Sequence, residues 1–207
     1  MFKSNGWHTQ WILRYGETQQ SHYHSRAHEC MAVLSGTATI RFGAADLTTD
    51  LKKSTWEDAH EAGVEVEAKA GDVFLIPAGV AHKTFDTSPK RDFALLTPGQ
   101  GRGIEVEDGN VEEALKRVTL EGFCMMGAYP EDGKWDFATG GEDAGDYESV
   151  WGIGKPERDP VLGLSESGLC AIWKEVDMTG FEEGRKREDK SFDGLRTEFS
   201  DLGLAKS

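Results

Sequence analysis

Alternating apolar and polar residues run through two stretches in the first half of the chain. Residues 37–42 and 64–69 both place apolar side chains at every second position, which is the period of a half-buried β-strand. A third stretch, 73–76, is continuously apolar and ends at Pro77, a residue that cannot donate a hydrogen bond to a β-ladder. The pattern predicts three strands, the last of which closes into a tight turn at Pro77-Ala78-Gly79.

The segment between the first two of these strands is polar and acidic. Residues 43–63 are rich in Asp, Glu, Thr and Ala, which predicts a solvated loop or short helix, outside the core, that connects two β-hairpins. A helix is also predicted further on, where Asn110 and Glu113 form the pattern of a capping box. Its apolar residues share one helical face: Val111, Leu115 and Val118.

The second half of the chain has fewer regular patterns. Residues 123–126 form an apolar run that predicts one more core strand, broken at Gly127. From 174 to 207, charges of both signs are mixed without an apolar face, which is typical of a docked extended segment or a partly disordered tail. We therefore expect one domain over residues 1–173 and a charged C-terminal tail over 174–207.

The composition favours an all-β fold. The 207 residues include 25 glycines and 6 prolines, and abundant glycine is typical of tight turns between short antiparallel strands. The formal net charge of −14 argues against nucleic acid and anionic membranes as partners, because both are bound mainly through Lys and Arg.

The cysteine spacing and the lengths of the apolar runs indicate the cellular compartment of the protein. Cys30, Cys124 and Cys170 are widely spaced and form no C-x-x-C pair, so neither a disulfide framework nor a thiolate zinc site is indicated. The chain has no apolar run of signal-peptide length at its start and none of about eighteen residues anywhere. We therefore expect a cytoplasmic protein.

The histidines carry the candidate chemistry. His22 and His24 are two residues apart, so on a strand both imidazoles project from one face. Glu29 follows after a short turn, and His82 lies just beyond the turn at Pro77, where a strand beside the first pair is expected to begin. Three neutral nitrogens and one carboxylate suit a divalent transition metal such as Fe, Mn, Zn or Ni, with copper also possible on ligand type, and leave positions open for water, oxygen or substrate.

Two nearby residues are weighed as further members of this site. His28 is adjacent to Glu29 and, on a strand, points to the opposite face. Asp86 is two and four residues beyond Thr84 and His82, so it is expected to share their face, either as a general acid or base or, the favoured interpretation, as a turn or strand-end residue. The other histidines, His8 and His60, are expected to be solvated.

The spacing of these residues resembles both signature motifs of the cupin superfamily. The first motif, G-x5-H-x-H-x3,4-E-x6-G, is matched by Gly16, His22, His24, Glu29 and Gly36. The second motif, G-x5-P-x-G-x2-H-x3-N, is matched by Gly71, Pro77, Gly79 and His82, with Asp86 in place of the usual asparagine. The resemblance implies a jelly-roll β-barrel with one or two short helices and a C-terminal extension. The motif glycines are interpreted as backbone requirements at turns.

Shorter segments resemble the YjlB-like branch of cupins. They are N-G-W (5–7), H-Y-H-S-x-A-H-E (22–29), I-P-A-G-V-A-H-K (76–83), G-A-Y-P (127–130) and D-P-V-x-G (159–163). The chain departs from that branch in lacking its usual segment before N-G-W and in carrying an insertion at about 88–122. The insertion is expected to be either a lid over the pocket or a surface loop.

These features support functions of different classes. The first is a metal-dependent enzyme, of the oxygenase (oxidoreductase), decarboxylase or isomerase type, whose small-molecule substrate chelates the metal. The second is a non-catalytic module that binds a small molecule on the same barrel, and the third is a structural or storage role. No catalytic residue is assigned beyond the four metal ligands, and a homodimer is expected.

Overall fold

The computed structural model describes residues 1–173 apart from 59–62, 108, 132, 141–148 and 151. The predicted charged tail, 174–207, and His60 lie outside the described residues. Among the residues that are described, no helix is long and apolar enough to cross a membrane.

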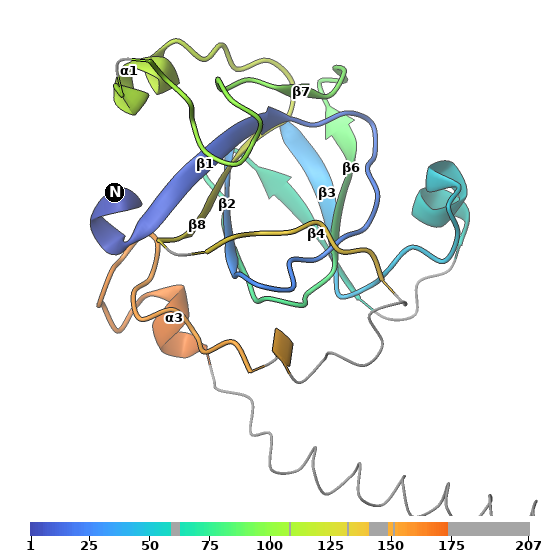
Figure 1. The fold of residues 1–207 in the computed structure, drawn as a ribbon. Helices are drawn as coiled ribbons and strands as arrows, with labels where there is room; N and C mark the ends of the chain where they lie inside the picture. Colours follow the sequence, from blue (N-terminus) through green and yellow to red (C-terminus); the bar gives the residue numbers. More distant parts are fainter. Residues whose placement is uncertain (59–62, 108, 132, 141–148, 151, 174–207) are drawn as a thin grey trace, which may run out of the picture. The chain divides into compact units, whose positions relative to one another are not determined.

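Most of the described residues with regular structure belong to two antiparallel β-sheets (Figure 1). The larger sheet has the strand order β5 (Val73–Ile76), β2 (Glu29–Ser35), β8 (Cys124–Pro130), β1 (Trp7–Arg14), β7 (Ala94–Leu95). The smaller sheet has the order β4 (Val64–Lys69), β3 (Thr37–Phe42), β6 (His82–Ser88). The helical elements are short: η1 (Lys3–Asn5), η2 (Lys53–Glu57), α1 (Val111–Lys116) and α3 (Leu169–Ile172). This architecture confirms the all-β prediction.

The hydrophobic core lies between the two sheets. Trp11 and Met31 reach it from β1 and β2, Met125 from β8, and Ile40 and Ala68 from the smaller sheet. The three predicted strands are present as β3, β4 and β5. In β4 only the second half follows the alternation, because Ala68 is buried whereas Val64 remains 63% exposed.

The predicted break at Gly127 is wrong, because β8 continues through this residue to Pro130. Gly127 pairs with Trp11 of β1. A Cβ atom at position 127 would lie only 2.1 Å from the indole of Trp11, so glycine makes room for a large core side chain. The glycine marks a close approach within the sheet and does not end the strand.

The turn interpretation of the motif glycines holds for three of the four. Gly36, Gly71 and Gly79 have φ values of +72°, +96° and +82°, in the left-handed region that glycine adopts at low cost. For Gly16 the interpretation is wrong, because its φ lies outside that region and a Cβ would meet Phe93 at an ordinary 3.5 Å.

The acidic segment 43–63 does contain the predicted short helix, but the expectation that it stays outside the core is wrong. Lys83 of β6 is completely buried, and its Nζ donates to Asp46 Oδ1 at 2.5 Å and to Thr55 Oγ1 at 2.9 Å. Asp46 Oδ2 also accepts from the backbone N–H of Ser21 at 2.8 Å. A buried ammonium needs such partners, so this segment supplies the polar groups that cover one side of β6.

The insertion at 88–122 adds an edge strand and a helix. Its strand β7 pairs with β1, with Leu95 opposite Leu13. The predicted capping box is present in part, since the Asn110 side chain accepts from the Glu113 N–H at the start of α1. None of the residues of α1 is buried.

Two segments that resemble YjlB-like cupins at opposite ends of the domain contact each other. The Asn5 side chain donates to the carbonyls of Pro160 and Val161, both at 3.1 Å. The buried Trp7 indole donates to the carbonyl of Arg158 at 2.9 Å. The segment around 158–161 therefore fastens the beginning of β1.

Candidate metal centre

Three of the four predicted ligands are imidazoles on two neighbouring segments. His22 and His24 lie between β1 and β2, and His82 opens β6 as predicted. The predicted strand at 22–24 is limited to isolated bridges, one joining His22 to His82 and one joining Tyr23 to Ala138. In the first bridge, the N–H of each histidine donates to the carbonyl of the other, at 3.1 and 2.8 Å. This pair of backbone hydrogen bonds holds His22 and His82 side by side.

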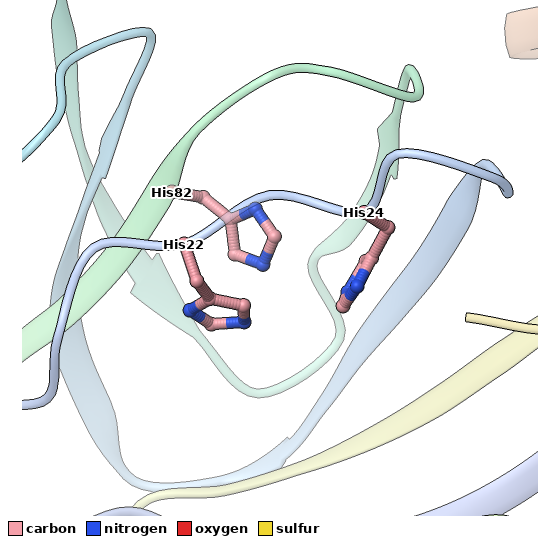
Figure 2. Close-up of side chains that lie close together, drawn as sticks. All are labelled: His22, His24 and His82. Carbon is pink, nitrogen blue, oxygen red and sulfur yellow. The ribbon is translucent and has the colours of Figure 1, made fainter. Parts of the chain in front are cut away.

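The three imidazoles converge on one point, as Figure 2 shows. One nitrogen from each of His22, His24 and His82 lies within 4.8 Å of the other two. The ring centroids are 4.4 to 5.5 Å apart, and the three residues are only 8%, 4% and 2% exposed. A single ion can therefore contact all three rings.

Backbone carbonyls fix which nitrogen of each ring is free. The Nδ1 atoms of His22 and His82 lie 3.1 Å from the carbonyls of Gln20 and Val80, and Nδ1 of His24 is hydrogen-bonded to the carbonyl of Asp136. A carbonyl only accepts, so each Nδ1 carries a proton and donates it. Nε2 is then the nitrogen that can bind a cation, and such a partner on Nδ1 is typical of metal-binding histidines.

Glu29, the first residue of β2, supplies the carboxylate of the cluster. Its Oε2 lies 3.2 Å from Nε2 of both His24 and His82, is buried, and accepts no hydrogen bond. An anionic oxygen and two lone-pair nitrogens at this distance repel one another unless a positive charge lies among them. The donor set therefore fits a bound cation.

The pKa values of this cluster follow from burial and from Glu29. Burial, with help from His82, lowers the pKa of His22 to about 3, so this ring is neutral at physiological pH. Burial alone would lower the pKa of His24, but the close approach and negative charge of the Glu29 carboxylate outweigh burial and raise it. Burial likewise raises the pKa of Glu29, but His24 and His82 outweigh it and hold that pKa well below its usual range. Glu29 is therefore a carboxylate, and protons compete with a metal for the cluster.

A segment that the sequence motifs do not include covers the histidines. The Phe137 ring stacks on His22, with centroids 4.0 Å apart and planes at 12°. Asp136 accepts from the backbone N–H of Ser25 at 2.7 Å and from its hydroxyl at 2.6 Å, and Trp135 lies edge-on to His24. We call residues 135–138 the strap. The strap follows a turn-rich segment of the sequence, and its aromatic residues, Trp135 and Phe137, are the only sequence signal that could have indicated a role at the site.

The two doubtful residues both lie outside the cluster. His28 accepts from the N–H of Ala78 at Nδ1 and pairs with the carbonyl of Gly154 at Nε2, both at 2.9 Å, so it joins two loops. The expectation that Asp86 shares the face of His82 is wrong. Asp86 has a φ of +52° at an irregularity in the β3–β6 register, is exposed, and accepts from the Trp56 indole at 3.0 Å. It is neither a turn nor a strand-end residue, contrary to the favoured interpretation, because β6 continues to Ser88; its role is structural, at an irregularity within the strand. His8 is half-exposed beside Glu131.

The lowered pKa of His22 predicts that the metal-free protein is sensitive to acid. Between pH 6.5 and about 3, the unfolded chain protonates His22 and the folded chain does not, so stability falls as the pH falls through this window. From pH 6.5 to about 4.5 we expect His22 to cost about 2 kcal/mol of the free energy of unfolding. Urea unfolding of the chelator-treated His22→Phe variant should show a shallower pH dependence than wild type. The exposed His8→Phe variant is the control, and an unchanged slope in His22→Phe would contradict the assignment.

Comparison with known proteins agrees with these features. A family model described as Cupin matches residues 18–109, which include all four predicted ligands. The uncharacterized protein YjlB of Bacillus subtilis (strain 168) is 26% identical over 174 residues, covering 82% of this chain and 73% of YjlB.

Solved structures of similar proteins match only weakly. An uncharacterized conserved protein with a double-stranded β-helix domain from Klebsiella pneumoniae shares 16% identity at a TM-score of 0.31, over 64% of this chain and 79% of that one. Hazelnut (Corylus avellana) vicilin shares 11% at a TM-score of 0.28, over 60% of this chain and only 23% of the vicilin. Such scores carry no argument about function. The family match over residues 18–109 and the similarity to YjlB support a YjlB-like cupin domain protein, and the two-sheet fold agrees with them.

Proposed function

We propose that this protein is a metal-dependent enzyme that acts on a small organic substrate, with His22, His24, Glu29 and His82 as the metal ligands. The observation that carries the proposal is the unpaired, buried Oε2 of Glu29, which faces Nε2 of His24 and His82 at 3.2 Å. The ligand set of imidazoles and one carboxylate favours a divalent transition metal such as Fe, Mn, Zn or Ni.

Each group of residues in the cluster has a distinct role at such a metal site. The three imidazoles and the carboxylate hold the ion, and the backbone carbonyls on Nδ1 keep the rings oriented. A bound ion supplies Lewis-acid polarisation and, where it is redox-active, activation of oxygen. These four ligands leave coordination positions for substrate oxygens, as oxygenase, decarboxylase and isomerase chemistry all require.

The alternative is a module of the same fold that binds a small molecule without converting it. One observation favours this alternative. Phe137 of the strap stacks on His22, and Trp135 lies edge-on to His24, so aromatic rings suited to holding a small molecule border the histidines. Phe137 of the strap covers one face of His22 and would lie beside any small molecule bound at the ion.

Elemental analysis of protein purified without chelators tests the metal. We expect near-stoichiometric Fe, Mn, Zn or Ni, and a protein that contains no metal and takes none up would refute the proposal. Oxygen uptake and carbon dioxide release with a panel of small acids and phenols then separate the two functions. Turnover of any member supports an enzyme, and tight binding without turnover supports the binding module.

The remaining expectations about the protein in the cell stay predictions. A homodimer is tested by sedimentation velocity on the full chain, and a cytoplasmic location by fractionation of cells that express it.

A further inference from the structure

One buried side chain that belongs to neither signature motif contacts the carboxylate of the cluster. Tyr129 comes from β8 and is 1% exposed. Its hydroxyl donates to Glu29 Oε1 at 2.5 Å and lies 3.4 Å from His24 Nε2. A carboxylate oxygen accepts hydrogen bonds, so the phenol is the donor in this contact.

The two oxygens of Glu29 therefore have different surroundings. Oε1 is occupied by the phenol of Tyr129, whereas Oε2 accepts no hydrogen bond and faces the imidazoles. A carboxylate can bind a cation through one oxygen or through both. A strong, short hydrogen bond to one oxygen favours binding through the other.

We propose that Tyr129 is a positioning residue of the metal centre, which occupies Oε1 of Glu29 so that only Oε2 is presented to the ion. This inference rests on the proposed metal-binding function. Binding through a single oxygen leaves one more coordination position open for substrate than binding through both. Tyr129 thereby determines how many substrate atoms the centre accommodates.

Besides its edge-on contact with His24, the Tyr129 ring has support from other parts of the chain. The Tyr129 ring stacks on Trp135, with centroids 5.7 Å apart and planes at 14°. The Trp135 indole donates to Gln10 Oε1 at 2.7 Å. Arg102, from the insertion, lies over the Trp135 ring at 4.6 Å and donates to its carbonyl at 2.9 Å. Gln10 and Arg102 thus support the ring on which Tyr129 rests.

The test uses Co²⁺ as the probe, because its visible absorption weakens as its coordination number rises. Chelator-treated wild type, Tyr129→Phe and Tyr15→Phe are titrated with Co²⁺. Tyr15 is a matched control, since it is buried in the same core and packs edge-on against Phe123. We expect the Tyr129→Phe variant to bind Co²⁺ about ten-fold to a hundred-fold more weakly and to give a weaker visible spectrum. The Tyr15→Phe variant should match wild type in both.

Infrared spectroscopy of the Co²⁺-loaded wild type gives a second readout that does not depend on folding of the variant. The separation of the two carboxylate stretches of Glu29, identified by comparison with Glu29→Gln, should be that of a carboxylate bound through one oxygen. A separation typical of binding through both oxygens overturns the inference, as does a Tyr129→Phe variant with wild-type affinity and spectrum. In either case the metal-binding proposal stands, whereas wild type that binds no Co²⁺ overturns both.

Discussion

Replacement of His82 by alanine is expected to reduce metal retention by more than about ten-fold while a folded β-domain remains. His82 is one of the three imidazoles whose nitrogens converge within 4.8 Å, and its Nε2 faces Glu29 Oε2. Its loss removes one ligand and leaves the core between the two sheets intact. The metal-to-protein ratio after gel filtration gives the result, and far-UV circular dichroism checks the fold.

The matched control for His82→Ala is His8→Ala, which removes a half-exposed imidazole beside Glu131. This variant should keep the wild-type metal content. Retention of metal at the wild-type level in His82→Ala would show that the ligand set is misassigned. Equal losses in both variants would point to a general effect of histidine removal.

Replacement of Gly36 by alanine should lower the free energy of unfolding by about 3 kcal/mol or more. Gly36 joins β2 to β3 at a φ of +72°. A Cβ there would lie 2.6 Å from the Ser88 carbonyl oxygen and 2.7 Å from that of Gly122. Backbone strain and overlap with two backbone segments both oppose the side chain. Urea denaturation at neutral pH measures the change.

Gly71→Ala separates the two causes. Gly71 has a similar φ of +96°, but a Cβ there meets nothing within 4 Å, so only the strain remains and the loss should be about 1 kcal/mol. If both variants lost the same stability, overlap at Gly36 would not matter, and the tight packing of the β2–β3 turn would be contradicted.

The sequence predicts the features that depend on local spacing. The alternation at 37–42 defines β3, and the apolar run before Pro77 defines β5, because strand period and turn chemistry act over a few residues. The two-residue spacing of His22 and His24 and the place of His82 just beyond the Pro77 turn predict that the three imidazoles meet, although residues 22–24 form only isolated bridges. Reasoning from spacing fails at Asp86, where one residue with positive φ changes which face the side chain takes.

The groups around the histidines could not be predicted from spacing. Tyr129 reaches Glu29 from 100 residues further along the chain. Asp136 binds His24 through its backbone carbonyl, an atom that every residue has, so its identity carries no signal. Asp46 of the acidic segment forms a buried ion pair with Lys83 of β6. Sequence reasoning does not foresee this pair, because Asp and Lys are ordinarily exposed to solvent.

The position of β1 in the larger sheet has a consequence for how the chain is made. Of the strands described here, β1 is synthesised first, yet its partners are β7 and β8, whose residues follow about eighty and more than a hundred positions later. Until β8 has been synthesised, β1 can pair only with the two residues of β7, and the rest of its backbone edge stays unpaired in the nascent chain. Complete pairing of β1 therefore has to wait for synthesis of more than a hundred further residues, which makes this strand a late step in the assembly of the larger sheet.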